Sequence, residues 1–255
     1  MLKICKYVIV DLVRNKIVLS YMVILFAITM GLFNLDENPV KGLLGLLNIT
    51  LLIVPLVSVI FGTIYYYNSA EFIELLLTMP IRRRSILFSV YLGLAVALSA
   101  AVLIGMGIPL LIYAPNSSGL ALLIVSLALT WVFVSIAVLA SVLTRDKAKG
   151  IGVVILLWLY FGLIYDALLI FILFSFNDYP MEKAMVAMSA LNPIDLGRIF
   201  ILLHLDISAI MGYTGAIFRD FLGTGTGMVF ALLMLCAWIF LPLWMATRRF
   251  NRKDI

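Results

Sequence analysis

The sequence predicts an all-α membrane protein with six transmembrane helices, and three observations carry this prediction. Hydrophobic residues make up 65% of the 255 residues and charged residues only 12%, against about 25% charged residues in a soluble domain. The apolar residues fall in six stretches, and a run of about 18 or more is long enough to span a bilayer. Runs such as IVPLVSVIFGTIYYY lack the apolar–polar alternation of membrane β-strands.

Each span is expected to be a helix, because lipid offers the backbone no hydrogen-bond partner. The spans lie at about residues 17–33, 43–67, 86–113, 120–143, 151–176 and 228–247. The second and third exceed a straight crossing, so tilt or a bend at Pro55 or Pro109 should absorb the excess. We expect a single membrane domain over residues 1–255.

Loop charges predict the orientation. If both termini lie on one side, that side holds 14 of the 18 basic residues, and the other side holds only Lys41, Lys183, Arg198 and Arg219. Positively charged loops stay in the cytoplasm, so both termini are expected there. The net charge of +5 is therefore a topology signal, and no nucleic-acid partner is expected.

Two segments on the cytoplasmic side are amphipathic. Residues 1–16 alternate basic and apolar side chains and should lie along the membrane interface. Residues 68–85 predict a short helix with Glu71 and Glu74 in its first turns, where the helix dipole favours acids. Pro80 should end this helix, and Arg82, Arg83 and Arg84 follow it.

The short helix has two interpretations. The arginines can serve as an anchor beside anionic headgroups. Alternatively, the segment is a coupling helix that docks in a groove of a cytoplasmic motor, with Glu71 and Glu74 as polar contacts. An apolar face of Phe72, Leu75, Leu76 and Met79 fits docking, and packing on the membrane surface explains it equally well.

The outer loop, residues 177–227, is the largest segment outside the spans. Helical periodicity covers Met181–Ala190 and Ile194–Leu205, and Asn192 with Pro193 forms a turn between them. Asp195 stands near the start of the second helix. We expect helices at, or dipping into, the outer face, as a lid on a transport path or a platform for a partner.

Asp166 is the acid inside a span, and buried acids in lipid are costly and often functional. It is expected to serve a pathway or gate, or to be paired structurally, for example with a tyrosine hydroxyl. Met181, Met185 and Met188 share a helical face, and thioether sulfur suits Cu(I). Methionine also fills apolar interfaces, and no cysteine or histidine lies nearby, so no metal site is expected.

The sequence carries no catalytic set. The glycine-rich stretch at 223–227 lacks the lysine and the preceding strand of a phosphate-binding loop, and no such motif occurs elsewhere. We expect a chain that is not an enzyme and binds no cofactor. Work driven by ATP then needs a separate ATPase subunit.

The architecture resembles the six-span permeases of the ABC-2 exporter class. The shared features are the amphipathic N-terminus, the helical outer loop, and the stretch EFIELLLTMP at residues 71–80 followed by three arginines. The resemblance implies a non-catalytic permease subunit in a bacterial inner membrane, with ATP and Mg on cytoplasmic ABC ATPase subunits. Glu71, Glu74, Arg82, Arg83 and Arg84 would transmit ATPase motion.

Within that class, three stretches carry a closer resemblance: EFIELLLTMPIRRRSILFSVYLG at residues 71–93, LNPIDLGRIFILL at residues 191–203 and the glycine-rich GYTGAIFRDFLGTGTG at residues 212–227. They are similar to the membrane subunits of the complex that matures nitrous oxide reductase. This resemblance implies a homodimer, a periplasmic β-helical accessory protein contacted by Asn192, Asp195 and Arg198, and assembly of a copper–sulfur centre. An exporter of another cargo, such as a lipid, peptide or drug, and a non-transport membrane scaffold remain as alternatives.

Overall fold

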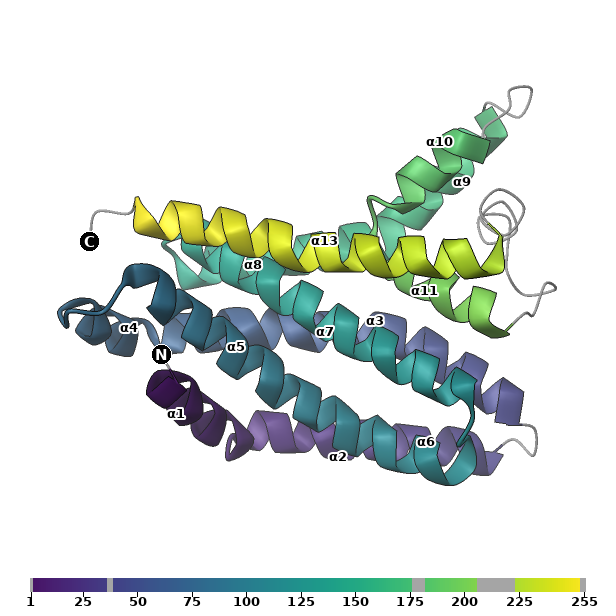
Figure 1. Ribbon diagram of the computed structural model, residues 1–255, viewed down its shortest axis with the longest axis horizontal. Coiled ribbons are helices and arrows are strands. Elements are labelled where there is room, and N and C mark those ends of the chain that lie inside the picture. Colours follow the sequence, from purple (N-terminus) through teal and green to yellow (C-terminus); the bar gives the residue numbers. More distant parts are fainter. Residues whose placement is uncertain (1, 36–38, 176–181, 206–222, 253–255) are drawn as a thin grey trace.

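The computed structural model describes residues 2–35, 39–175, 182–205 and 223–252. Within these ranges the chain forms helices and no strands, which confirms the predicted all-α class (Figure 1). The α-helices are α1 (Leu2–Val13), α2 (Lys16–Leu35), α3 (Pro39–Asn68), α4 (Ala70–Leu77), α5 (Arg83–Val102), α6 (Ile108–Tyr113), α7 (Ser117–Leu143), α8 (Lys147–Leu159), α9 (Tyr165–Ser175), α10 (Glu182–Ser189), α11 (Pro193–Leu205) and α13 (Thr224–Asn251). Two π-helical turns, η1 (Leu103–Gly107) and η2 (Tyr160–Ile164), join α5 to α6 and α8 to α9.

The six predicted spans are confirmed. Six helical stretches of the described chain are long and apolar enough to cross a membrane, and each overlaps one predicted span. They are Lys16–Leu35, Val40–Asn68, Arg83–Tyr113, Ser117–Leu143, Lys147–Ser175 and Gly225–Asn251.

The two prolines at which a bend was expected lie in different helical surroundings. Pro55 lies inside α3, which continues as one helix past it. The third span instead changes at η1, a wide turn that ends directly before α6, where Pro109 is the second residue. Proline cannot donate a backbone hydrogen bond, so a local change of helix type close to Pro109 is physically reasonable. The fifth span has a second wide turn, η2, that hydropathy alone did not predict.

Helix α7 is the centre of the bundle. Its most apolar stretch is 72% buried, the largest share among the six candidate spans, and it packs against α3, α5, α11 and α13. Its buried hydroxyls are satisfied within the helix: Ser126, Thr130 and Ser141 each donate to the carbonyl four residues earlier, at 2.6–2.8 Å. Small and hydroxylated residues thus allow close packing without leaving polar groups unpaired in an apolar interior.

Helix α1 packs along the start of the third span. Val8 and Leu12 are buried, and α1 lies against α5 at Gly93. A Cβ added to Gly93 would lie 2.3 Å from Val8 Cγ1, so only glycine allows this approach. The ring of Tyr7 stacks on Phe72 of α4, with centroids 5.4 Å apart. The amphipathic N-terminus therefore supports α4 directly.

Figure 1 shows that both chain termini and α4 lie at one end of the bundle, which we call the terminal end. Helices α10 and α11 lie toward the opposite end, which we call the distal end. Helix α13 runs along the bundle between the two ends. The two segments with candidate functional residues are thus separated by the length of the membrane-spanning helices.

Candidate functional site

The helix predicted between the second and third spans is present as α4. It ends at Leu77, three residues before Pro80, and the Thr78 hydroxyl bonds to the Leu75 carbonyl at 2.7 Å. Both Glu71 and Glu74 are exposed. An acid in the first turn of α4 suits the helix dipole, and the exposed carboxylates are available to a partner.

The apolar residues of α4 lie on two sides of the helix. Ile73 and Leu76 are the buried residues, whereas Leu75 is 64% exposed and Met79 is 52% exposed. Glu71, Glu74, Leu75 and Thr78 are spaced by three or four residues and all face outward, because such positions share one side of a helix. The exposed side therefore combines two acids with a large apolar residue, a mixture that suits a protein partner.

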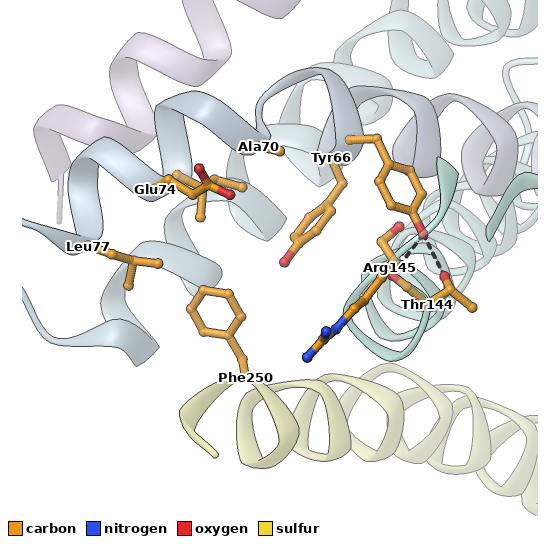
Figure 2. Close-up of a pocket in the computed structure, with 10 residues that line it drawn as sticks. Tyr66, Ala70, Glu74, Leu77, Thr144, Arg145 and Phe250 are labelled. Carbon is orange, nitrogen blue, oxygen red and sulfur yellow. Dashed lines mark hydrogen bonds between the residues drawn. The ribbon is translucent and has the colours of Figure 1, made fainter. Parts of the chain in front are cut away.

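A cavity of about 360 Å³ lies beside α4, and we call it the terminal cavity. It is lined by Tyr66 and Tyr67 at the end of α3, by Ala70, Ile73, Glu74 and Leu77 of α4, and by Ser141, Thr144, Arg145 and Phe250. Figure 2 shows Glu74 and Arg145 on different sides of this cavity, with Phe250 of α13 beneath. The helix is therefore supported by one face only and has open space beside it.

The far wall of the terminal cavity is fixed. The Tyr67 hydroxyl donates to the Thr144 carbonyl at 3.1 Å, which ties the end of α3 to the end of α7 (Figure 2). Lys147 donates to the Asn68 side chain at 2.8 Å, so the start of α8 joins the same corner. No ion pair joins Glu74 to Arg145 within the described parts of the chain. Both opposite charges thus face a rigid cavity without meeting.

The three arginines after Pro80 do not form one cluster around a single pocket. Arg82 precedes the first turn of α5 in an extended conformation, and all three side chains are exposed. Arg84 lines a separate pocket with residues of α13. The coupling role of these arginines remains a prediction.

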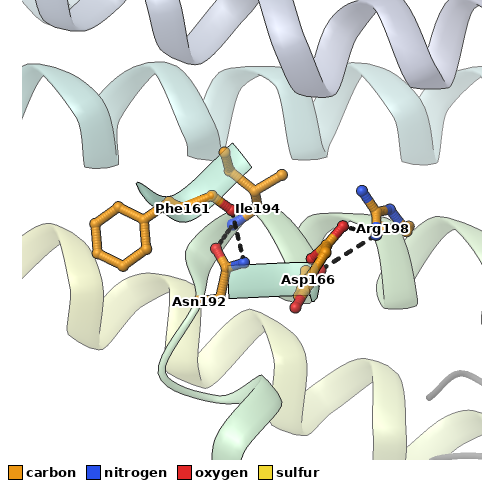
Figure 3. Close-up of polar contacts among 6 residues, drawn as sticks. Phe161, Asp166, Asn192, Ile194 and Arg198 are labelled. Carbon is orange, nitrogen blue, oxygen red and sulfur yellow. Dashed lines mark hydrogen bonds and ion pairs between the residues drawn. The ribbon is translucent and has the colours of Figure 1, made fainter. Parts of the chain in front are cut away.

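At the distal end, Asn192 organises the connection from α10 to α11. Its side-chain amide donates to the Phe161 carbonyl in η2 at 2.9 Å, and its side-chain oxygen accepts from the Ile194 backbone at 3.0 Å (Figure 3). The wide turn of η2 thus presents a carbonyl to Asn192, which also caps α11. Asn192 is fully buried, so it holds α11 in place and is not presented to a partner.

Helix α11 enters the bundle at the distal end. It packs against α13, α7 and α3, and Ile194, Leu196 and Phe200 join the main core. A Cβ added to Gly197 would lie 2.9 Å from Val125 Cγ1 of α7, so glycine allows the close contact. Helix α11 is therefore packed into the helix bundle.

Asp166, Asp195 and Arg198 form one ionic cluster. Arg198 Nη1 lies 2.7 Å from Asp166 Oδ2 and 3.3 Å from Asp195 Oδ1 (Figure 3). The side chains of Arg198 and Asp166 are 35% and 28% exposed, whereas that of Asp195 is 8% exposed. The acid of the fifth span is therefore paired structurally, as one of the alternatives expected, with Arg198 as its partner.

The cluster contains more negative than positive charge. Burial, followed by the nearby Asp166 carboxylate, raises the pKa of Asp195 above its ordinary value, although Arg198 opposes the shift. Asp195 Oδ2 is buried and has no hydrogen-bond partner. The Asp195 side chain is thus largely buried, which argues against the direct partner contact that the sequence suggested. Arg198 keeps partial exposure.

Met185 serves packing. It is 1% exposed and lies in a small core formed by α9, α10 and α11, with Tyr165, Leu169, Ile199 and Leu202. Met188 packs against the same core, and Met181 lies outside the described residues. The methionine face therefore fills an apolar interface, as thioether side chains commonly do.

Sequence reasoning missed several residues of both sites. Arg145 and Phe250 line the terminal cavity, and Trp238 of α13 donates to the Ala190 carbonyl at 3.1 Å. Arg145 had been counted only as a topology charge. Its position directly after a span, facing an acidic short helix, was the available signal.

Together, six apolar helices and a short, exposed acidic helix beside a cavity describe a multi-pass membrane protein. The chain belongs to the ABC-2 family of transporter proteins, whose family model matches residues 9–255. It is therefore a permease subunit of a bacterial ABC transporter.

Two curated relatives agree with this membership. A probable ABC transporter permease protein NosY of Stutzerimonas stutzeri is 26% identical over 267 residues, covering 95% of each chain. A probable ABC transporter permease protein NosY of Pseudomonas aeruginosa is 31% identical over 148 residues, covering 54% of each chain.

Proposed function

We propose that this permease subunit couples cytoplasmic ATP hydrolysis to work on the periplasmic side, in the maturation of the copper–sulfur centre of nitrous oxide reductase. ATP and Mg bind to a separate ATPase subunit, and this chain binds neither. The working unit is a homodimer in the bacterial inner membrane with both termini cytoplasmic. The concentration of basic residues at the terminal end supports that orientation.

The observation that carries the proposal is the placement of α4. Its acidic and apolar side faces outward, while the terminal cavity lies beside it. An ATPase that grips Glu71, Glu74 and Leu75 can press α4 into this cavity. Such a movement brings Glu74 toward Arg145, so opposite charges favour the displaced position.

The route to the distal end passes through packed helices. Helix α4 contacts α3 and α5, both contact α7, and α7 contacts α11 and α13. Closely packed interfaces shift between discrete arrangements rather than deforming smoothly. Movement of α7 therefore reaches α11, where Asp195 and Arg198 form the ionic cluster with Asp166 of α9. At this distal end, a periplasmic β-helical accessory protein would receive the movement.

The maturation role rests on two supports. The stretches at residues 71–93 and 191–203 resemble the membrane subunits of that system, and the curated relative named NosY covers 95% of this chain. The absence of a nucleotide-binding motif from the sequence agrees with an external ATPase.

Purification of the full chain from its native membrane tests the proposal. A tagged chain is solubilised in a mild detergent, and the bound proteins are identified by mass spectrometry. We expect an ABC ATPase in equal amount and a periplasmic β-helical protein. An ATPase without a periplasmic partner would favour an exporter of another cargo, and isolation without any ATPase would favour a scaffold. A tagged unrelated six-span protein serves as the control.

A further inference from the structure

A groove and a pocket on the outside of α13 meet end to end near the terminal end. The groove has a volume of about 520 Å³ and is lined almost entirely by apolar atoms of Phe88 on α5 and of α13 residues from Ala237 to Thr247. The pocket has a volume of about 370 Å³ and is lined by Arg84, Arg248, Asn251 and Arg252. Trp244 and Thr247 line both.

The pocket is positively charged. Among the described residues, its lining contains three arginines and no acidic residue. None of Arg84, Arg248 and Arg252 forms an ion pair with another described residue. The Arg248 guanidinium instead lies 5.5 Å from the centre of the Trp244 ring. Three guanidinium groups around one pocket, without a carboxylate partner among the described residues, suit a phosphate, which arginine binds in a bidentate way.

The groove has the dimensions of a lipid chain in one leaflet. It follows α13 from Ala237 to Thr247, and ten helical steps cover about 15 Å. The hydrocarbon core of a bilayer is about 30 Å thick, so each leaflet supplies about half of that length. Exposed Trp244 lies where groove and pocket meet, and tryptophan prefers the boundary between headgroups and hydrocarbon.

We infer that α5 and α13 form a binding site for one anionic phospholipid in the leaflet at the terminal end. The phosphate contacts Arg84, Arg248 and Arg252, and an acyl chain lies in the groove beside Phe240 and Leu241. Asn251 adds a neutral hydrogen-bonding group. The site is separate from the terminal cavity, and it does not depend on the proposed maturation function.

Bound lipid would join α5 and α13 at the terminal end. Helix α13 has only 22% of its most apolar stretch buried, so much of its surface depends on what surrounds it. A phosphate held by arginines of both helices links α5, which follows α4, to α13, which lines the terminal cavity at Phe250. The lipid therefore stabilises the helix pair around the docking region.

The test uses the purified full chain in a neutral detergent, titrated with dioleoyl phosphatidylglycerol or with dioleoyl phosphatidylcholine. Intact-protein mass spectrometry counts bound lipid. We expect phosphatidylglycerol to bind at least about tenfold more tightly, because each basic side chain near an anionic group contributes about fivefold. Equal binding of the two lipids would overturn the inference without the use of any variant.

Variants then locate the site. Arg84→Gln, Arg248→Gln and Arg252→Gln together should weaken phosphatidylglycerol binding on the order of 100-fold. The control replaces Arg14, Lys16 and Lys149 by Gln, which removes the same charge from the same end and should leave binding within about twofold. Equal losses of phosphatidylglycerol binding in both triple variants would show that the lipid is attracted by the overall surface charge, and would contradict a specific binding site.

A groove-filling variant separates the acyl chain from the headgroup. Ala237→Trp should reduce dioleoyl phosphatidylglycerol binding and leave glycerol 1-phosphate binding unchanged. Strong displacement of the lipid by inorganic phosphate alone would mean that the pocket binds free phosphate, which contradicts a lipid site.

Discussion

Reversal of both acids on α4, Glu71→Lys with Glu74→Lys, is expected to abolish stimulation of the partner ATPase by this chain. Both carboxylates are exposed and neither forms an ion pair with a described residue, so the fold does not depend on them. Juxtaposed like charges at an interface cost several kcal/mol. Association with the ATPase should therefore weaken on the order of 100-fold.

The measurement is ATPase activity of the reconstituted complex, together with the amount of ATPase that co-purifies. The matched control is Arg14→Glu with Lys149→Glu, which reverses two exposed charges at the same end outside α4. It should retain association within about threefold. Undiminished stimulation by the α4 variant would reject its coupling role.

The second large effect is expected at Arg198. Arg198→Gln removes the cation that Asp166 and Asp195 share, and it leaves the Asp195 side chain buried beside another carboxylate. Breaking a buried pair costs 3–5 kcal/mol, and the partial exposure of Arg198 lowers this. We expect the free energy of unfolding to fall by about 2 kcal/mol at pH 8.

The loss of folding stability caused by Arg198→Gln should depend on pH. Arg198 favours the charged form of Asp195, whose pKa in the folded chain is raised by burial and by Asp166. At pH 5, Asp195 is already mostly protonated, so the arginine has less charge to stabilise. The destabilisation by Arg198→Gln is therefore smaller at pH 5 than at pH 8, because the folded variant must bind a proton or carry an unpaired charge as the pH rises.

Thermal unfolding in detergent at both pH values checks this account. The double variant Asp195→Asn with Arg198→Gln removes the buried charge as well and should recover most of the stability at pH 8. A loss equal at pH 5 and pH 8, with no recovery in the double variant, would assign Arg198 a packing role only.

Hydropathy determines much of the fold, because crossing a bilayer demands long apolar helices whatever their neighbours are. The six spans, α4 and the two helices of the outer loop could therefore be predicted. The π-turn η2 could not, since its apolar residues read like those of the neighbouring α-helices and its carbonyl partner, Asn192, lies 31 residues further along the chain.

The candidate sites were only partly predictable, for a different reason. Glu71 and Glu74 were found because a short acidic helix between spans is unusual. Which apolar residues of α4 are buried could not be predicted, because Leu75 and Met79 are as apolar as Ile73 and only packing distinguishes them. Asp166 and Arg198 are 32 residues apart in the sequence, and local sequence patterns do not predict a contact over that separation.

The central claim is that a separate ATPase grips α4 from the terminal end. Site-specific photo-crosslinking in native membranes tests it most directly, with a photoreactive phenylalanine placed at Leu75. The control position is Leu233 on α13, which has the same exposed fraction, 64%, within a membrane-spanning helix. A covalent adduct with an ABC ATPase from position 75 and none from position 233 is the predicted result. An active complex that gives no ATPase adduct from position 75 would contradict it.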